Sequence, residues 1–578
     1  MLEIKRRIPQ CSFEDSEQAR NLDPLLRRIY ENRNVATLDQ SRYSLKQLLP
    51  PDRLLGIQRA TDILVAAIQR RESIIIIGDY DTDGATATVL AILGLSALGA
   101  KKVDYLVPNR FEFGYGLSEK IASLALETNP DVLVTVDNGI SSLAGVELVR
   151  NNGVKCIITD HHLPGKSLPN ADAIVNPNQP DCPFPSKALS GVGVMFYLLL
   201  AVRSALRDIN WFGQAEGPTQ PPNLADYLDL VALGTVADMV PLDSNNRILV
   251  AQGIARIRKG QCRPGIIELL RIGGKDYRKV ASSDFGFVVG PRLNAAGRLD
   301  DISTGIDCLL SSDRQIATEY AEMLDGINSE RRRIEKDMQH RAFDIIRSLK
   351  LENDGFGYCL YDDQWHQGVT GLVASRVKDK TQQPTIAFAP SADGLLTGSA
   401  RTIAGLHIRD LLEEIADDDP GLIVKFGGHA MAAGLTIEAT RFEAFSNRFQ
   451  VTLARAVKKA GNLEVTVLSD GELASEQLTL TQAEQLKDAA PWGQGFPSPV
   501  FDGIFNVLDY KVVGGQHIKL TVQDTARVRY DAIAFRAVEP GIEPEIAKSI
   551  HMAYQLDVNE FRGQRSLQLI VEQLLPAS

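Results

Sequence analysis

The chain has 578 residues, and a chain of this length is expected to fold into roughly three or four domains. Its 44% hydrophobic and 23% charged residues are typical of a globular protein, and it contains no apolar stretch of about 18 residues that would span a membrane. The net charge of −11 excludes binding to nucleic acid through overall charge, so any such site needs a local basic surface.

The N-terminus and the cysteines favour a cytoplasmic location. The first ten residues, MLEIKRRIPQ, contain no apolar signal core. The six cysteines lie far apart without paired spacing: Cys11, Cys156, Cys182, Cys262, Cys308 and Cys359. This spacing argues against a disulfide framework and a zinc knuckle, and it is typical of buried thiols in a reducing compartment.

Short apolar strands alternate with helical segments from residue 73 to about 245. The alternation predicts an α/β domain with a doubly wound parallel sheet over residues 71–312, with residues 1–70 as a lead-in packed on it. The predicted strands are 73–77, 102–107, 132–136, 156–159 and 173–175.

The second half of the chain changes character twice. A long, highly charged helical pattern over 313–351 predicts a connecting helix, and 352–460 resumes the strand and helix pattern of a second α/β domain. Residues 464–578 contain five predicted strands with short turns, which suits a small all-β barrel of oligonucleotide-binding (OB) type. An SH3-like or immunoglobulin-like module would give a similar pattern.

Three carboxylates follow the first strand of the predicted sheet, at Asp79, Asp81 and Asp83. Gly78 ends the apolar run, and small residues after Gly84 open a predicted helix. Strand, acidic turn and helix place polar groups at the carboxyl edge of a parallel sheet. A metal site and a solvated acidic turn both fit this stretch by itself.

Other predicted strands end in the same kind of side chain. Residues 132–136 lead into Asp137, and 156–159 lead into Asp160, His161 and His162, while Asp238 lies in a later helical segment. Each acid alone could be a helix N-cap or a turn residue. Parallel strands bring these ends to one edge, where unpaired acids are costly, so together they predict a two-metal site. Carboxylates and imidazoles without thiolates favour Mg²⁺ or Mn²⁺.

Nine motifs make the chain recognisable. Four of them resemble, in this order, the DHH phosphoesterase superfamily: GDYDTDG, VTVDNGIS, TDHHLPG and ALGTVADMVPL. Five more narrow the resemblance to the bacterial single-stranded-DNA-specific exonucleases of that superfamily: LVPNRFEFGYGL, GVGVMFYL, GPRLNAAGRL, DQWHQGVTG and KFGGHAMAAG. The resemblance covers essentially the whole chain and identifies residues 352–460 as the DHH-associated domain (DHHA1).

The resemblance also implies residue roles at the sheet edge. Two divalent metals, Mg²⁺ or Mn²⁺, are expected, with Asp137 as the bridging carboxylate. The implied ligand positions are Asp81, Asp83, Asp137, His161 and Asp238. Asp79, Asp160 and His162 are expected to orient the ligands and the phosphate.

An exonuclease acting from a 5′ end needs to recognise a terminal phosphate, and arginine forks suit that geometry. The expected phosphate- or DNA-binding residues are Arg110, Arg292, Arg298, Ser399, Arg401, Gly428 and His429. Structural salt bridges are the alternative for Arg110 and Arg298. A further basic stretch, 251–299, carries ten Lys or Arg against three acids, and a solvated helical face explains most of it equally well.

The activity that the resemblance implies is a metal-dependent 5′→3′ exonuclease that degrades single-stranded DNA to mononucleotides in recombination and repair. Single-stranded-DNA-binding protein and a helicase are the implied partners, and we expect a monomer. One alternative is a DHH phosphodiesterase for short oligonucleotides or cyclic dinucleotides, or a pyrophosphatase, but such chains usually lack the last 115 residues. A non-catalytic replication scaffold is the other, but it would have lost metal ligands that are present here.

Overall fold

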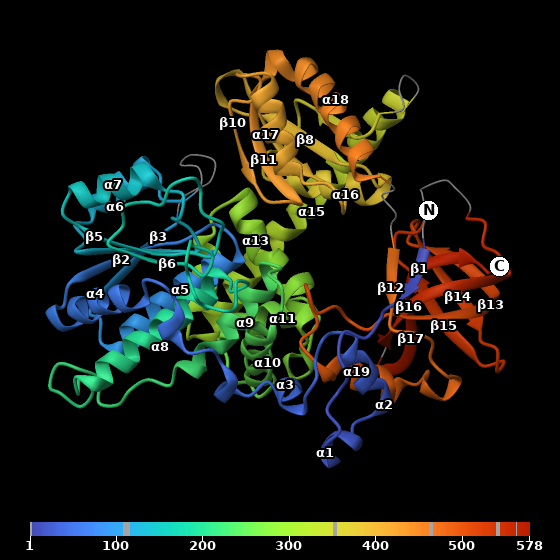
Figure 1. Ribbon diagram of the computed structural model, residues 1–578, viewed down its shortest axis with the longest axis horizontal. Coiled ribbons are helices and arrows are strands. Elements are labelled where there is room, and N and C mark those ends of the chain that lie inside the picture. Colours follow the sequence, from blue (N-terminus) through green and yellow to red (C-terminus); the bar gives the residue numbers. More distant parts are fainter. Residues whose placement is uncertain are drawn as a thin grey trace. The chain divides into compact units, whose positions relative to one another are not determined.

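In the computed structural model (Figure 1) the chain forms two compact units. The first unit comprises Met1–Gly297, Asp301–Leu324 and Thr466–Ser578, and the second comprises Arg298–Asp300 and Asp325–Val465. The structure describes residues 3–107, 116–350, 355–461, 466–538, 544–561 and 563–577.

The first unit contains a five-stranded, all-parallel sheet in the order β3-β2-β4-β5-β6. Its strands are β2 (Ser73–Ile77), β3 (Lys102–Leu106), β4 (Val132–Val136), β5 (Lys155–Thr159) and β6 (Ala173–Val175). The inner strands are apolar runs because helices cover both faces. The chain order reverses between β2 and β4, and ligands of open parallel sheets bind at such a switch point.

Helices lie on both faces of this sheet, so it is doubly wound as predicted. Apolar side chains of α6 (Glu119–Glu127) and α7 (Leu143–Asn151) pack with those of β2, β4 and β5 on one face. The other face carries α4 (Ile57–Arg70), α5 (Thr82–Leu98) and α8 (Gly191–Asp208), as Figure 1 shows. Two of these helices, α5 and α8, begin at the carboxyl edge of the sheet.

A group of further helices extends this part of the first unit: α9 (Leu228–Ala237), α10 (Ser244–Arg258), α11 (Pro264–Ile272), α13 (Gly290–Leu299) and α14 (Ser303–Leu310). Helix α9 packs on α5 and α8. Helix α13 approaches the turn after β2 so closely that a Cβ atom at Gly297 would lie 1.8 Å from the carbonyl oxygen of Tyr80. The predicted connecting helix is α15 (Arg314–Lys350).

The second unit is built on a mixed sheet in the order β10-β11-β9-β8-β7. The strands are β7 (Tyr358–Tyr361), β8 (Thr385–Pro390), β9 (Leu395–Arg401), β10 (Lys425–Gly428) and β11 (Ala432–Glu438). Helices α16 (Thr370–Thr381), α17 (Ile408–Asp418) and α18 (Phe442–Ala460) complete it. Phe388, Phe445 and Phe449 are buried in its core, which confirms a second α/β fold.

The C-terminal strands form a closed barrel in the order β13-β14-β15-β17-β16. They are β13 (Phe501–Val513), β14 (His517–Gln523), β15 (Arg529–Ala534), β16 (Ser549–Phe561) and β17 (Gln564–Pro576). Closure leaves no open sandwich of two sheets, so the immunoglobulin-like alternative is excluded. Helix α19 (Leu480–Ala489) packs against β16 and β17.

The N-terminal segment is shared between the sheet and the barrel region. Helix α4 packs against β6 and α8, whereas β1 (Glu3–Arg6) pairs in parallel with β12 (Thr466–Ser469) beside the barrel. The Arg33 side chain is 2% exposed and bonds in bidentate fashion to Asp470, which is fully buried. Residues 3–53 therefore contact both the helices of the parallel-sheet region and the segment that precedes the C-terminal barrel.

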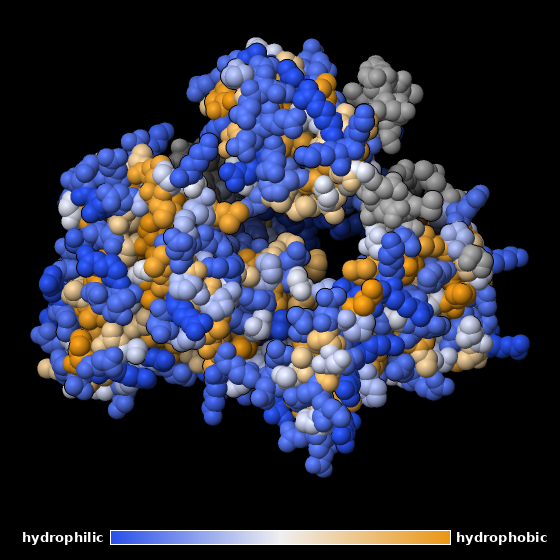
Figure 2. Space-filling view, viewed as in Figure 1, coloured by the Kyte–Doolittle hydropathy of each residue, from blue (hydrophilic) through white to orange (hydrophobic). Residues whose placement is uncertain are grey.

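On the face seen in Figure 2 most side chains are hydrophilic; orange ones form a vertical band at the left, over the region of the parallel sheet, and elsewhere lie in small groups or singly. Isolated exposed apolar residues of this kind are normal for a globular protein. Among the helices that the structure describes, none is both long and apolar enough to cross a membrane.

Candidate metal centre

The acidic turn after β2 is held by its own helix and by a neighbouring one. Asp81 is the N-cap of α5, and its side chain accepts a hydrogen bond from the Gly84 amide at 3.1 Å. The carboxylate of Asp83 is fully buried at the N-terminus of α8, where it accepts from the amides of Gly191 (2.6 Å) and Val192 (3.0 Å). The positive end of the α8 dipole thus stabilises this buried negative charge.

Asp137 follows β4 in a left-handed backbone conformation, with φ of +63°. Asp tolerates this region better than most residues, but the conformation still stores strain, which concentrates at functional sites. Its surroundings leave no spare volume, because a Cβ atom at Gly191 would lie 2.4 Å from the Cβ atom of Asp137. The α8 N-terminus therefore fixes the positions of both Asp83 and Asp137.

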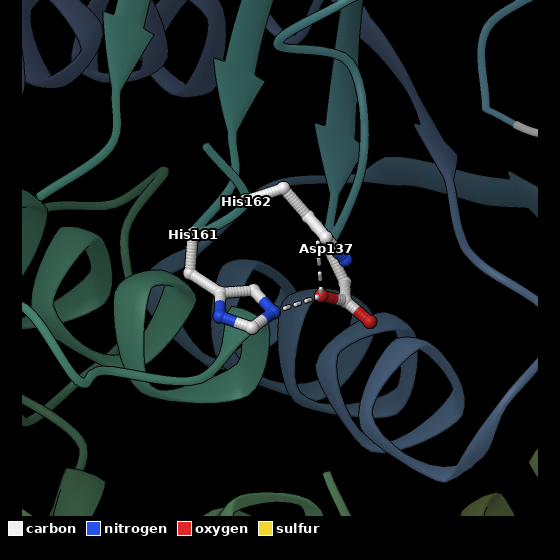
Figure 3. A group of neighbouring side chains, drawn as sticks. All are labelled: Asp137, His161 and His162. Carbon is white, nitrogen blue, oxygen red and sulfur yellow. Dashed lines mark ion pairs between the residues drawn. The ribbon is translucent and has the colours of Figure 1, made fainter. Parts of the chain in front are cut away.

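The two histidines after β5 point toward these acids. Figure 3 shows the His161 ring directed at the Asp137 carboxylate, with Nε2 3.1 Å from Oδ1. The same nitrogen lies 3.4 Å from Asp238 Oδ2 and 4.0 Å from Asp83 Oδ2. His162 Nδ1 is 4.0 Å from Asp137 Oδ1. One imidazole nitrogen thus faces three carboxylates that come from three separate elements.

Asp238 reaches the site from the C-terminal end of α9, where it is the C-cap residue. Its Oδ2 atom is buried and has no hydrogen-bond partner in the part of the chain that the structure describes. The next residue, Met239, has φ of +61° and a side chain that is 70% exposed. A buried carboxylate oxygen without a donor is costly unless a cation satisfies it.

Three overlapping groups of potential ligand atoms result, and the atoms of each lie within 4.8 Å of one another. The groups are Asp137, His161 and His162; Asp83, His161 and Asp238; and Asp79, Asp81 and Asp137. Together the three groups contain Asp238 and all the residues predicted at the sheet edge except Asp160. All donors are carboxylate oxygens or imidazole nitrogens, a set that fits Mg²⁺ or Mn²⁺.

The pKa values of the clustered carboxyl groups also indicate that this site binds cations. Burial, followed by the charge of Asp81, raises the pKa of Asp79 well above its ordinary value. Burial and the charge of Asp83 do the same for Asp137 and Asp238. Burial and Asp81 together raise the pKa of Asp83 to about 7. Ionised acids at this density repel one another unless a cation lies between them.

Asp160 has a different role from the other acids, because it binds the histidines. Its Oδ1 atom accepts from the amides of His161 (2.7 Å) and His162 (3.0 Å) and bonds to His162 Nδ1 at 2.8 Å. Burial acts to raise the pKa of Asp160, but the hydrogen bond and charge of His162 outweigh it and lower that pKa. Although burial opposes it, the bond to Asp160 raises the pKa of His162 to about 9.

Four of the predicted phosphate-binding residues lie at one end of the sheet of the second unit. Strand β9 ends at Arg401, which pairs with Ala432 of β11, and the amide of His429 donates to the Ala432 carbonyl at 2.8 Å. Gly428 has φ of +146°, and Ser399 Oγ lies 3.0 Å from the hydroxyl of Thr370 at the start of α16.

The three remaining arginines of that prediction are placed differently. Arg298 belongs to the second unit, where its Nη1 atom donates to the Gly368 carbonyl at 3.4 Å. Arg292 belongs to the first unit and is buried, with Nη1 donating to Val288 O within the same region. Arg110 lies outside the described residues.

The basic stretch 251–299 is largely neutralised by acids within the first unit. Its members pair with carboxylates in the following way: Arg256 with Asp226, Arg258 with Asp488, Arg263 with Asp229, Arg271 with Glu268, Lys275 with Asp284 and Lys279 with Glu560. These pairs favour the structural alternative for this stretch over a continuous basic surface.

Several groups that hold the site were not anticipated from the sequence. The amides at the start of α8 are one example. Asn138 is another, since its Nδ2 atom donates to the carbonyls of Ile77 (3.0 Å) and Val136 (2.9 Å) and so ties together the ends of β2 and β4. Asn294 of α13 accepts from the amide and hydroxyl of Thr82 beside the acidic turn. In the sequence, the sole sign of these two asparagines was their place within the recognised motifs VTVDNGIS and GPRLNAAGRL.

Comparison with known proteins covers almost the entire chain. The DHH family N-terminal domain matches residues 73–235, the DHHA1 domain matches 353–455, and the RecJ OB domain matches 469–573. The single-stranded-DNA-specific exonuclease RecJ of Dickeya dadantii is 50% identical over 566 residues, which are 97% of this chain and 98% of that protein. The RecJ of Escherichia coli is 48% identical over the same shares of the two chains.

A solved structure resembles this one over its full length. The crystal structure of RecJ in complex with Mn²⁺ from Thermus thermophilus superposes with a TM-score of 0.81 at 28% identity, over 100% of this chain and 80% of that one. The Mg²⁺ complex from the same organism gives a TM-score of 0.76 at 26% identity.

Proposed function

The chain belongs to the RecJ family of single-stranded-DNA-specific exonucleases, and from this membership we propose that it removes mononucleotides from the 5′ end of single-stranded DNA with two divalent metal ions, Mg²⁺ or Mn²⁺. The observation that carries the proposal is the set of three overlapping ligand groups at the edge of the parallel sheet. No serine or cysteine nucleophile is needed for such a reaction.

We assign Asp81, Asp83, Asp137, His161 and Asp238 as the metal ligands. Asp137 and His161 each belong to two of the three groups. We assign Asp137 as the shared ligand, because a carboxylate has two oxygens to offer and the start of α8 packs closely against this one. When bound, a pair of divalent ions lowers the pKa of an attacking water and neutralises charge on the phosphoryl oxygens. In this assignment a metal ion contacts the buried Oδ2 atom of Asp238, which lies 3.4 Å from His161 Nε2 and accepts no hydrogen bond from the described residues.

His162 is assigned to the substrate phosphate. The bond between its Nδ1 atom and Asp160 fixes the orientation of the ring and raises the pKa of His162 to about 9. In this assignment the Nε2 side of the ring contacts a phosphate oxygen. Asp160 holds the ring in this orientation.

We assign binding of the 5′ phosphate or of the DNA strand to the end of the second unit's sheet, with Ser399, Arg401, Gly428 and His429. Arg110, Arg292 and Arg298 are assigned, each by itself, to contacts with the phosphates of the DNA. Burial lowers the pKa of Arg401, and an anion bound next to the guanidinium would favour its charged form. Replacing Arg401 by Lys is expected to reduce the preference for 5′-phosphorylated over 5′-hydroxyl oligonucleotides, because a lysine lacks the two-pronged donor. Arg409→Lys, at an exposed arginine of α17, is the matched control.

The proposal is tested with oligonucleotides labelled at the 5′ or 3′ end, in Mn²⁺ or EDTA. We expect early release of labelled mononucleotide from the 5′ end only, and no release in EDTA. Degradation that starts at the 3′ end, or that persists without metal, would contradict the proposal. Asp137→Asn is expected to abolish cleavage and to keep most of the single-strand affinity, and equal loss of both would make Asp137 structural.

A phosphodiesterase for short oligonucleotides or cyclic dinucleotides is the competing activity. The C-terminal barrel favours a long strand, so the rate on a 30-nucleotide strand is expected to exceed the rate on a dinucleotide by about tenfold or more, since each added stacked base contributes binding energy. The monomeric state, the cytoplasmic location and the partners, a single-stranded-DNA-binding protein and a helicase, stay predictions. Light scattering of the purified chain tests the first of these.

A further inference from the structure

The peptide groups of the two adjacent histidines are hydrogen-bonded on both sides. Their amides donate to Oδ1 of Asp160, as described above. Their carbonyls accept from two asparagine side chains: Asn178 Nδ2 donates to the His161 carbonyl at 2.6 Å, and Asn176 Nδ2 donates to the His162 carbonyl at 2.9 Å. Two consecutive residues are thus fixed at all four of their backbone polar atoms.

Both asparagines belong to one short segment, residues 176–182, which follows β6 at the carboxyl edge of the sheet. The Asn176 side chain is fully buried, and its Oδ1 atom accepts from the Asn178 amide at 2.7 Å, which sets the direction in which its NH₂ group points. The strand before it is also attached to the site, since the Asp160 amide donates to the Val175 carbonyl at 3.1 Å.

Other side chains anchor this segment without touching the histidines. Lys187 Nζ donates to the carbonyls of Pro177 and Cys182, each at 2.7 Å. Gln179 Nε2 donates to the carbonyls of Leu55 and Ile174, each at 3.0 Å. The segment is therefore rigid independently of its two bonds to the histidines, and it can act as a fixed support for them.

We propose that Asn176 and Asn178 are positioning residues for the reaction: by holding the carbonyls of His161 and His162 they aim His161 Nε2 at the three carboxylates. The distances of 3.1, 3.4 and 4.0 Å from this nitrogen to the carboxylates of Asp137, Asp238 and Asp83 leave little tolerance. A productive site tolerates displacements of only roughly 0.5 Å, so the orientation of the His161 peptide plane, which sets the position of its ring, has to be fixed. The inference rests on the proposed metal site and adds the residues that orient its imidazole ligand.

A purely structural role for the asparagines predicts a different outcome from a positioning role. If Asn178 merely stabilised the loop, its loss would resemble the loss of Gln179, which anchors the same segment to Leu55 and Ile174. If it positions His161, its loss weakens metal binding and turnover beyond any loss of stability. Groups that orient metal ligands typically contribute about 10–100-fold in affinity or activity.

The test uses the full chain with three substitutions. Asn178→Ala removes the donor at a half-buried position and adds no charge. Gln179→Ala removes a loop anchor, and Asn152→Ala removes an equivalent side-chain bond to a backbone carbonyl, that of Leu148, far from the histidines in the fold of the sheet. Each protein is measured for Mn²⁺ affinity by titration calorimetry and by electron paramagnetic resonance of free Mn²⁺, for melting temperature, and for kcat and KM on single-stranded DNA.

For Asn178→Ala we expect about a tenfold or greater rise in the Mn²⁺ dissociation constant and a similar fall in kcat. KM for DNA stays within about twofold, and the melting temperature falls no further than that of Gln179→Ala. Asn152→Ala keeps the wild-type Mn²⁺ affinity, and Gln179→Ala, in which Lys187 still anchors the segment, keeps most of it. Unchanged Mn²⁺ affinity in Asn178→Ala, or equal losses in Asn178→Ala and Gln179→Ala, would overturn the inference. A wild-type protein that binds no Mn²⁺ would instead overturn the proposed function, and this inference with it.

Discussion

Removal of the metal ions is expected to make the first unit less stable as the pH rises. Without cations, the buried acids of the site keep their protons in the folded state to a higher pH than in the unfolded state. Asp83 shows this clearly, with an ordinary pKa of 3.8 and a folded-state pKa of about 7. Between these two values the folded protein binds the extra proton, so the free energy of unfolding decreases with pH.

The magnitude follows from the same pKa values. At 1.36 kcal/mol for each pKa unit, ionisation of Asp83 alone destabilises the metal-free protein by about 4 kcal/mol at pH 8 relative to pH 3.8. Roughly 2 kcal/mol of this falls between pH 5.5 and 7, or a few degrees in melting temperature. Asp79, Asp137 and Asp238 shift in the same direction and increase the effect.

The assay is thermal unfolding followed by tryptophan fluorescence in EDTA and in saturating Mn²⁺ at pH 5.5, 6.5 and 7.5. Trp365 lies in the second unit, so Trp365→Phe leaves Trp211 and Trp492 as reporters of the first. We expect the melting temperature in EDTA to fall as pH rises. The stabilisation by Mn²⁺ is expected to grow over the same range, because deprotonated carboxylates bind the ion.

Two variants separate this explanation from a general effect of charge. Asp238→Asn is expected to raise the melting temperature in EDTA at pH 7.5 and to reduce the stabilisation by Mn²⁺. Asp52→Asn, at an exposed site, is expected to change neither. A metal-free protein whose stability is constant or rises from pH 5.5 to 7.5 would refute the reasoning.

Two further substitutions test the packing of the site and the attachment of the N-terminal segment. Gly191→Ala is expected to destabilise the protein by about 1–3 kcal/mol and to abolish Mn²⁺ binding, because the new methyl group lies 2.4 Å from the Asp137 Cβ atom. Calorimetry measures both effects. Gly165→Ala, where a Cβ atom meets nothing within 4 Å, is the control, and an equal loss in this variant would contradict the argument. Arg33→Ala is expected to cost about 3 kcal/mol, the low end for breaking a buried ion pair, because the Asp470 carboxylate loses its bidentate partner but keeps the Asn32 side chain and Arg7 at 3.8 Å. Urea unfolding measures the cost, and amide hydrogen exchange in the barrel strands shows where it falls. Unchanged exchange there would show that the pair is not needed.

Much of the architecture was predictable from local patterns. Each strand of the first sheet is a short apolar run between turn residues, and the observed bounds of β2 and β4 agree with those expected. The polar helical period over 313–351 corresponds to α15. The alternating pattern of the last part of the chain predicted five strands, but closure into a barrel depends on the pairing of β15 with β17, which no local pattern encodes.

The site was predictable where its residues follow strands and not elsewhere. Asp79, Asp137 and His161 lie within two residues of the ends of parallel strands, and strand direction alone brings those ends to one edge. Asp238 was recognisable by its motif, but its approach depends on how α9 packs on α5. The asparagines that support the histidines had no such signal, because a side chain that bonds to a backbone carbonyl can come from any nearby segment.

By itself, then, the order of residues determined which groups are available at the sheet edge: carboxylates and imidazoles of the kind that bind hard divalent cations. Tertiary structure decided which atoms face one another, through the α8 amides that hold Asp83 and the segment 176–182 that holds the histidines. The physical reason is that periodicity and turn chemistry act over a few neighbouring residues. A metal site depends on distances between atoms whose residues lie from a few tens to more than a hundred positions apart, and packing sets those distances.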